Sequence, residues 1–368
     1  MVQSAKKSVV LIGAGHTHAL VLQDWARAHL DDIDVTVVDL RASAVYSGML
    51  PGFVAGHYAR EALDIDVGRL VARLGGRFIQ DAAVGINVSA KTIALRSGQP
   101  SISFDVVSFD VGITSAMPQV PGFTDHGVPA KPLPAFVDRW LACRDGVAAP
   151  RIAVIGGGVA GVELAMAMAH ALKTKEKPYH ITVLDRGQIL SAISHGAAKR
   201  IRAALKDHQI NVHEEADICE VTSEGVSLAD GSMVQADFTV GAAGAMPHAW
   251  LAETELELNA GYIAVNSHLQ ASDPSVFAAG DCVHFAPAPL PKAGVYAVRM
   301  APTLGRNLLA KARGDGLETY NPQTDFLKLI SLGGQRAVAE KFGVSFAGRW
   351  AWWLKNRIDG QFMDSFRR

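Results

Sequence analysis

The chain of 368 residues is long enough for two or three domains of ordinary size. Hydrophobic residues make up 49% of it and charged residues 19%, a composition that allows sizeable cores and excludes intrinsic disorder. The 35 basic and 36 acidic side chains give a net charge of −1, which argues against a dedicated nucleic-acid-binding protein.

The chain opens with a predicted strand, turn and helix. Val9 to Ile12 is a short apolar strand, Gly13-Ala14-Gly15 is the turn, and His16 to His29 has helical spacing. A β-branched strand then ends at Asp39, where a carboxylate can hold a ribose hydroxyl. We interpret this unit as a dinucleotide-binding turn formed by Gly13, Gly15, His16, Thr17, His18 and Asp39.

His18 stands where a third glycine is expected, so we predict looser packing of helix on strand at this point. His16 and His18 are two residues apart, which puts them on different sides of a helix. No cysteine or acidic residue lies close to them in the sequence. We therefore predict no metal site and treat both histidines as structural or cofactor-proximal.

The pattern recurs in mid-chain in complete form. A strand over 151–155 runs into Gly156-x-Gly158-x-x-Gly161, a helix follows, and a strand over 180–184 ends at Asp185. Two such units predict two Rossmann-like, three-layer α/β domains. In the second, the dinucleotide would be held by Gly156, Gly158, Val159, Ala160, Gly161 and Asp185. Asp185 favours NADH over NADPH, although the adjacent Arg186 could instead bind a 2′-phosphate.

Breaks in composition suggest where the domains begin and end. The stretch 118–134 is rich in Pro and Gly and is interpreted as a linker, and a second break lies near 241–247. We predict a discontinuous first domain over 1–117 and 248–324, an inserted second domain over 118–247, and an appendage over 325–368.

A third motif, the apolar strand 275–279 followed by Gly280-Asp281, completes a pattern that resembles a known group. The order of the three motifs resembles the two-dinucleotide-domain flavoproteins of the pyridine nucleotide–disulfide oxidoreductase superfamily. The resemblance implies FAD on the first unit, including Gly280 and Asp281, and NADH or NADPH on the inserted unit. It also implies that 237–247, with Gly244, is the hinge back to the FAD domain.

The region 46–58 departs from the disulfide reductases of that superfamily because it contains no cysteine. A relay through a protein dithiol is therefore excluded, and Cys282 alone cannot replace one. The apolar segment with Met49, Leu50 and Pro51 resembles the corresponding segment of type II NADH dehydrogenases, which implies that these residues lie beside FAD. The regions 13–18, 46–58 and 328–366 also resemble the flavoprotein module fused to, or found near, selenide, water dikinase.

Two further residues are predicted to act near the cofactors. Lys292 and Ala293 precede a helix over 295–309, which in the superfamily points its N-terminus at the flavin. Lys292 would add positive charge there, with a solvated lysine as the alternative. Glu163 corresponds to a carboxylate near the contact of nicotinamide and flavin, with a surface acid as the alternative. We predict both as catalytic residues.

Near the C-terminus, an apolar residue recurs every four positions, at Phe346, Trp350, Leu354, Ile358, Phe362 and Phe366. Basic residues lie between them, and this pattern predicts an amphipathic helix. It would either pack on the protein or a second subunit, giving a homodimer, or lie on a membrane surface. We expect Trp352 to contact a different surface from Trp350 and Trp353.

Together these features predict an FAD-dependent NAD(P)H oxidoreductase that passes hydride from NADH to flavin and then electrons to a small acceptor. Quinone is the favoured acceptor, by analogy with type II NADH dehydrogenases. There are two alternatives. The acceptor could be a selenium or sulfur compound, or the protein could mainly bind a partner such as the enzyme selenide, water dikinase. Three widely spaced cysteines and the lack of a long apolar run favour the cytoplasm, with attachment to the inner face of its membrane left open.

Overall fold

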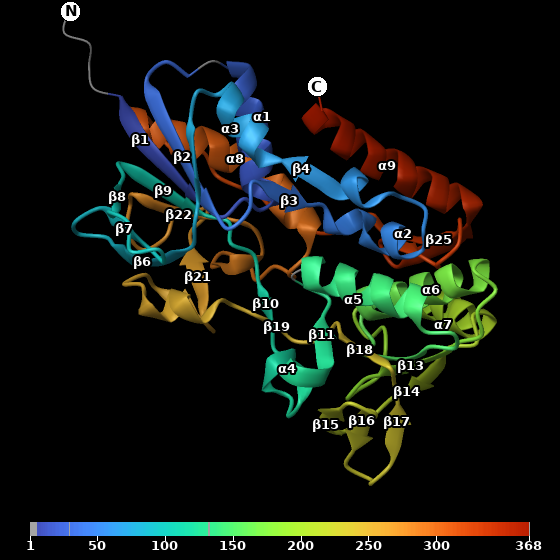
Figure 1. Ribbon diagram of the computed structural model, residues 1–368. Coiled ribbons are helices and arrows are strands. Elements are labelled where there is room, and N and C mark those ends of the chain that lie inside the picture. Colours follow the sequence, from blue (N-terminus) through green and yellow to red (C-terminus); the bar gives the residue numbers. More distant parts are fainter. Residues whose placement is uncertain (1–5, 29, 132, 368) are drawn as a thin grey trace, which may run out of the picture. The chain divides into compact units, whose positions relative to one another are not determined.

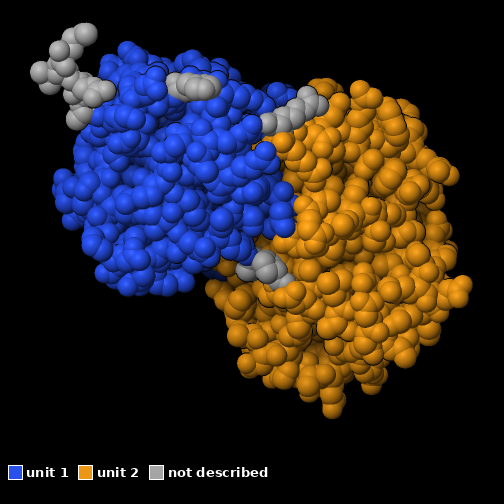
Figure 2. All heavy atoms as spheres, turned by 45° about the horizontal axis from the view of Figure 1, so that its top comes forward, with its two compact units in different colours: residues 1–46, 64–113, 246–324 blue, residues 47–63, 114–245, 325–368 orange. Residues whose placement is uncertain are grey.

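The computed structural model describes residues 6–28, 30–131 and 133–367 (Figure 1). The chain forms two compact units, each made of three stretches of sequence (Figure 2). Unit 1 comprises residues 1–46, 64–113 and 246–324, and unit 2 comprises 47–63, 114–245 and 325–368. The predicted appendage therefore belongs to unit 2, together with the short segment 47–63.

Unit 1 is built on a parallel five-stranded sheet in the order β22-β9-β1-β2-β5. Its central strand is buried on both faces, as parallel strands covered by other elements are, and Val9, Val10 and Leu11 are fully enclosed. The strands are β1 (Lys7–Ile12), β2 (Ile33–Asp39), β5 (Arg77–Gln80), β9 (Val106–Phe109) and β22 (Val276–Ala278).

Three helices of unit 1 pack on this sheet and on one another: α1 (His16–Ala28), α3 (Val67–Arg73) and α8 (Gly294–Arg313). The predicted end of the first helix, His29, lies outside the described residues. Smaller sheets complete the unit: β3 (Ser43–Val45) with β4 (Asp64–Asp66); β6 (Ala83–Asn87), β7 (Thr92–Leu95) and β8 (Ile102–Ser103); and β20 (Leu258–Asn259), β21 (Tyr262–Val265) and β23 (Val283–Phe285).

Unit 2 repeats the arrangement in a second parallel sheet, ordered β11-β18-β12-β13-β14. Its strands are β11 (Gly127–Pro129), β12 (Arg151–Ile155), β13 (His180–Leu184), β14 (Asn211–His213) and β18 (Phe238–Gly241). In both units the strand that leads into the glycine turn is flanked by the next strand of its motif and by a strand from later in the chain. These neighbours are β2 and β9 for β1, and β13 and β18 for β12. The parallel sheets confirm the predicted Rossmann-like α/β architecture.

Helices cover one face of the second sheet and an antiparallel sheet covers the other (Figure 1). The helices are α5 (Leu133–Gly146), α6 (Val159–Thr174) and α7 (His195–Asp207). The antiparallel strands are β15 (Ile218–Thr222), β16 (Gly225–Leu228) and β17 (Met233–Gln235). Short paired strands, β10 (Thr114–Ser115) and β19 (Ala245–Met246), stand where the chain passes between units.

The stretch 118–134, predicted to be the linker into the second domain, has secondary structure of its own. The stretch contains helix α4 (Phe123–His126) and strand β11, which hydrogen-bonds to β18 as the edge of the sheet. Proline is tolerated at such an edge, so Pro129 does not interrupt the pairing. Pro132 lies outside the described residues.

The C-terminal stretch forms an antiparallel sheet of β24 (Lys328–Ser331), β25 (Ala337–Lys341) and β26 (Val344–Gly348), followed by helix α9 (Arg349–Arg367). Within unit 2 this sheet contacts α6, α7 and α9, and the short helix α2 (Leu50–Val54) of segment 47–63 contacts α6.

The predicted four-residue stripe is only partly correct. Phe346 lies on β26, and the buried face of α9 consists of Ala351, Asp359, Met363 and Phe366. Trp350, Trp353 and Ile358 are exposed, whereas Trp352 packs against the small core formed by Ala337, Ala339 and Ala351. The expected separation of Trp352 from the other two tryptophans is confirmed.

None of the helices in the described ranges has the length and hydropathy of a membrane span.

Candidate functional site

The first glycine turn lies at the carboxyl end of β1. The next strand, β2, pairs on one side of β1 and the later strand β9 pairs on the other, so the strand order reverses at this point. Gly13 has φ +85°, and a Cβ there would come within 2.5 Å of the Asp110 carbonyl oxygen, so only glycine fits. Asp39 braces the turn: its Oδ2 accepts from the Ala14 amide at 2.7 Å and its Oδ1 from the Arg41 amide at 2.9 Å.

The side chain of His18 is tightly packed, so the prediction of looser packing at this position is wrong. The ring is fully buried, with Nδ1 2.6 Å from the Gly13 carbonyl oxygen and Nε2 2.8 Å from the Ser108 hydroxyl. Burial lowers its pKa to about 4, so the ring is neutral at physiological pH. His16 packs edge-on against Tyr46, with ring centroids 5.6 Å apart. Across the described residues, no group of three or more His, Cys, Asp or Glu is placed to hold a metal ion.

Asp110 is a central residue of this turn that the sequence reasoning missed. It follows β9 directly, is 3% exposed, and its Oδ2 accepts from the His18 amide at 3.0 Å. Burial raises its pKa to about 6, against the opposing effect of the hydrogen bond from His18. An acidic residue at the end of a strand or directly after it also occurs at Asp39 and Asp185, and this shared pattern was the available signal.

The Gly280-Asp281 motif reaches the same place from β22. Gly280 has φ +73°, and a Cβ at this position would collide with the Asp110 carboxylate. Unit 1 thus brings the predicted residues Gly13, Gly15, Thr17, His18 and Gly280 together around Asp110, and Asp39 braces the same turn. A glycine cradle at a helix N-terminus with an adjacent carboxylate fits a bound dinucleotide.

Cys282 and Lys292 are both engaged inside unit 1. The Cys282 thiol is fully buried and lies 3.1 Å from the Ala279 carbonyl oxygen, and burial raises its pKa to about 12. Such a thiol is inert at neutral pH. Lys292 Nζ donates to the Val283 carbonyl and lies 3.8 Å above the Tyr262 ring, so the alternative of a freely solvated lysine is excluded. Its role toward flavin stays a prediction, as does that of Ala293, the N-cap of α8.

The second glycine turn, in unit 2, has the expected geometry. Gly156 has φ +116°, and a Cβ at Gly161 would collide with the Gly156 carbonyl, so α6 needs glycine to pack this closely. A Cβ at Gly158 would meet nothing within 4 Å, which leaves its approach open for a phosphate. Asp185 braces this turn as Asp39 does the first, accepting from the Gly157 amide at 2.5 Å and the Gly187 amide at 2.8 Å.

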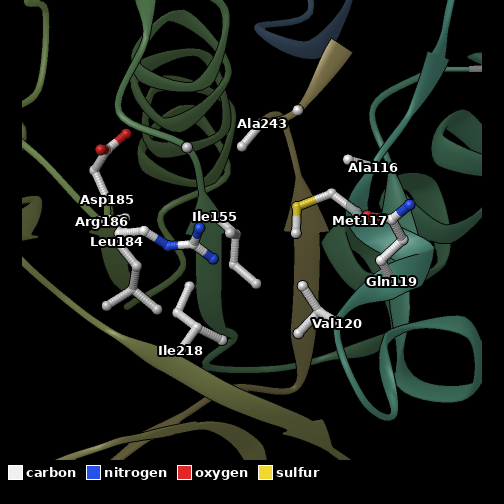
Figure 3. Close-up of a pocket in the computed structure, with 12 residues that line it drawn as sticks. Ala116, Met117, Gln119, Val120, Ile155, Leu184, Asp185, Arg186, Ile218 and Ala243 are labelled. Atoms are coloured by element: carbon white, nitrogen blue, oxygen red, sulfur yellow. The ribbon is translucent and has the colours of Figure 1, made fainter. Parts of the chain in front are cut away.

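A cavity of about 430 Å³ opens beside this turn (Figure 3). Arg186 extends into it, with its guanidinium toward Ile155. The other lining residues are mostly apolar, as an adenine-binding pocket requires: Ala116, Met117, Gln119, Val120, Gly156, Leu184, Asp185, Ile218, Ala243 and Gly244. The structure thus brings the predicted residues Gly156, Asp185 and Gly244 to one cavity, while Val159, Ala160 and Gly161 begin α6.

Glu163 is not a surface acid. It lies in the first turns of α6, and its Oε1 accepts from the Ser331 amide of β24 at 2.6 Å. Burial raises its pKa to about 7, and the positive charge of Lys355 opposes this rise. Its predicted role beside nicotinamide stays a prediction, and its observed partner is the C-terminal sheet.

Segment 47–63 presents a buried apolar surface, formed by Met49, Leu50, Pro51, Phe53 and Val54. Within unit 2 it is fastened to α9. Lys355 Nζ donates to the Gly48 carbonyl at 2.7 Å and to Asp359 Oδ2 at 2.7 Å, and the Tyr58 hydroxyl donates to Asn356 Oδ1 at 2.7 Å. Met49, Leu50 and Pro51 therefore belong to unit 2, whereas the other residues predicted to bind FAD belong to unit 1.

Comparisons with known proteins agree with this geometry. The NADH dehydrogenase-like protein YutJ of Bacillus subtilis is 24% identical over 345 residues, covering 90% of this chain and 91% of its own. The type II NADH:quinone oxidoreductase of Haemophilus influenzae is 27% identical over 210 residues, 52% of this chain and 47% of its own.

Two solved structures share the fold at low identity. NDH2 from Plasmodium falciparum in complex with NADH gives a TM-score of 0.82 at 12% identity and covers 98% of both chains. The sulfide:quinone oxidoreductase of Aquifex aeolicus gives 0.81 at 16% identity, over 98% of this chain and 91% of its own.

The sequence profile of one family, described as pyridine nucleotide-disulphide oxidoreductase, matches residues 7–301, which include both glycine turns and the Gly280-Asp281 motif. Members of this family are oxidoreductases that use FAD and NAD(P)H. The chain belongs to the pyridine nucleotide-disulphide oxidoreductase family, as an NAD(P)H-dependent flavoprotein oxidoreductase.

Proposed function

We propose that this protein is a NADH dehydrogenase that reduces a quinone directly, without a protein dithiol. The observation that carries the proposal is the chemistry of segment 47–63, which contains no cysteine and whose helix α2 is apolar. The one cysteine next to the Gly280-Asp281 motif, Cys282, is buried and has a raised pKa. Electrons must therefore pass to the acceptor without a thiol intermediate supplied by this chain.

The residues that would hold the cofactors follow from the two turns. Gly13, Gly15, Asp39 and Gly280 would hold FAD, and Gly156, Gly158 and Asp185 would hold NADH. When bound, FAD accepts a hydride from NADH and gives up two electrons to the acceptor. The buried apolar side chains of segment 47–63 would be the groups that contact a quinone ring, and Lys355 and Tyr58 fasten the segment to α9.

The test is an anaerobic titration with NADH followed by an acceptor screen on the reduced protein. We expect one equivalent of NADH to bleach the flavin and a short-chain quinone to reoxidise it rapidly. Rapid reoxidation by a selenium or sulfur compound, with quinone inactive, would replace the quinone proposal. Failure of NADH to bleach the flavin, with tight co-purification of selenide, water dikinase, would favour a binding role instead.

Cofactor preference follows from Asp185, whose carboxylate is held at the end of β13. A 2′-phosphate there meets a like charge, at a cost of about 1–2 kcal/mol in a surface-like dielectric. We expect kcat/KM for NADH to exceed that for NADPH by about 5–30-fold. Arg186→Ala should widen the preference, because it removes a cation that lines the cavity. Equal kcat/KM values for the two cofactors would show that Arg186 determines the choice.

We further propose that unit 2 binds a membrane surface through its exposed apolar side chains, which we call the tail patch: Phe342, Val344, Phe346, Trp350, Trp353 and Ile358. Such a patch on the surface of a protein marks an interaction site. Basic side chains accompany the aromatic ones. Lys341 Nζ lies 5.0 Å from the Phe342 ring and the Arg357 guanidinium 5.5 Å from that of Trp353. Aromatic and basic groups together are typical of helices that lie on anionic membranes.

Substituting Trp350 and Trp353 together by Ser should weaken binding to vesicles of anionic phospholipid by about tenfold or more. Vesicle flotation of the FAD-loaded protein measures this directly. The control is Leu40→Ser with Val84→Ser, two exposed apolar residues of unit 1. If vesicle binding is unchanged and the oligomeric state falls instead, the tail patch is a subunit interface.

A further inference from the structure

The side chain of Asp110 occupies the place that the first glycine motif leaves open. A Cβ at Gly15 or at Gly280 would collide with the carboxylate of Asp110, a residue that is 3% exposed. The second glycine of such a motif exists so that the backbone can approach a pyrophosphate. At Gly15, a carboxyl group of the protein itself, that of Asp110, lies next to this part of the backbone.

The carboxylate also takes up hydrogen bonds at the start of α1. Its Oδ2 accepts from the His18 amide at 3.0 Å, and the Thr17 amide faces it as well. These amides belong to the first turn of α1, the end of a helix that attracts the phosphates of a dinucleotide. FAD bound to this turn would therefore bring two phosphate charges to a helix end that already holds a carboxylate.

The titratable groups that face Asp110 act on its charge in opposite directions. From α1 it faces His16 and His18, and from the Gly280–Cys282 turn it faces Asp281 and Cys282. His18 is neutral because burial lowers its pKa to about 4. The charge on Asp281 raises the pKa of Asp110, and that on His16 lowers it.

We propose that FAD binds to unit 1 with the uptake of one proton, which Asp110 takes from solvent and keeps in the complex. The carboxylic acid then stands beside the pyrophosphate as a neutral group and a hydrogen-bond donor. The step forms one O–H bond with a proton from solvent, and no other covalent bond forms or breaks. The inference rests on unit 1 being the FAD site and goes beyond it, because it states which protonation state of this chain accepts the cofactor.

The sign of the pH dependence follows from the two pKa values of the carboxyl. In the free protein burial places the pKa at about 6, and two nearby phosphates would raise it further in the complex. FAD affinity should then fall about tenfold per pH unit between about pH 6.5 and pH 8.5, since the proton must be added on binding. Below about pH 6 affinity should level off.

The experiment is isothermal titration of apoprotein with FAD in two buffers of different ionisation enthalpy. At pH 7.5 the difference should report close to one proton taken up, whereas Asp110→Asn, which keeps the shape of the neutral acid, should take up none and bind FAD with a flat pH profile. Asp105→Asn is the matched control: Asp105 precedes β9 at its opposite end and accepts from the Ser8 amide. It should leave proton uptake unchanged.

No proton uptake by the unaltered protein, or uptake that persists in Asp110→Asn, would overturn the inference. The release of FAD from holoprotein after a jump to higher pH gives a second measurement that needs no apoprotein, and it should accelerate only while Asp110 is present. Failure of the protein to bind FAD at all would instead contradict the assignment of unit 1. The two failures are thus distinguishable.

Discussion

Gly158→Val should keep FAD bound and lose reduction by NADH almost completely. Gly158 is the N-cap of α6 with extended backbone angles, φ −67° and ψ 174°, which valine tolerates. A Cβ there meets no protein atom within 4 Å, so the variant should fold. The added isopropyl group would fill the approach to the helix end and displace the pyrophosphate. Misplacement by an ångström costs about 100-fold in rate, and we expect at least that loss.

Anaerobic stopped-flow reduction of the flavin by NADH measures the effect, with the FAD content of the purified protein as the companion value. Gly146→Val serves as the control, because Gly146 ends α5 in the same unit and its Cβ would also meet open space. Reduction in this control should proceed at the unaltered rate. Parallel loss of FAD and of the NADH reaction in Gly158→Val would mean that the two nucleotide sites are assigned to the wrong units.

The two dinucleotide units were predictable because each is a local pattern. A buried strand, a glycine turn and a helix occur within about thirty residues, and the sheets of β1 and β12 follow from them. The order of the remaining strands was not predictable to the same degree. β22 and β9 pair although they are far apart in the chain, and the edge strand β11 is only three residues long.

Site residues could be predicted where a residue type serves one structural purpose, as glycine does in these turns. They could not be predicted where the residue type occurs for many reasons. Glycines 13, 156 and 161 are required by backbone conformation or close approach, and the sequence located them. Asp110 was missed because an acid after a strand is common, and its importance depends on Gly15 and Gly280, which come from two other parts of the chain. His18 was misjudged because the sequence alone did not reveal that Ser108 would face it.

The tail was predicted from its four-residue period, but the buried face of α9 shares only Phe366 with that stripe. The period counts large apolar residues, whereas the buried face includes Ala351 and the charged Asp359. A buried acid in a helix is stable only with a partner, and that partner is Lys355, one helical turn away. A buried ion pair of this kind cannot be predicted from the periodicity of hydrophobic residues.

Lys355→Met should destabilise the protein by about 3–5 kcal/mol, the cost of removing one member of a buried ion pair. The side chains of Lys355 and Asp359 are 13% and 7% exposed, and their charged atoms lie 2.7 Å apart. The substitution keeps the aliphatic volume but takes away the cation and the hydrogen bond to the Gly48 carbonyl. Chemical denaturation of the holoprotein measures the loss in free energy of unfolding.

Arg367→Met is the matched control on the same helix, because Arg367 pairs with Asp364 in the open, with the two side chains 58% and 59% exposed. It should change stability by less than about 0.5 kcal/mol. Adding Asp359→Leu to Lys355→Met should restore much of the lost stability, since an apolar pair replaces the buried charge. The loosened segment 47–63 should also raise KM for quinone while NADH still reduces the flavin. A stability of Lys355→Met equal to that of Arg367→Met would show that the pair does not hold α9 against the segment.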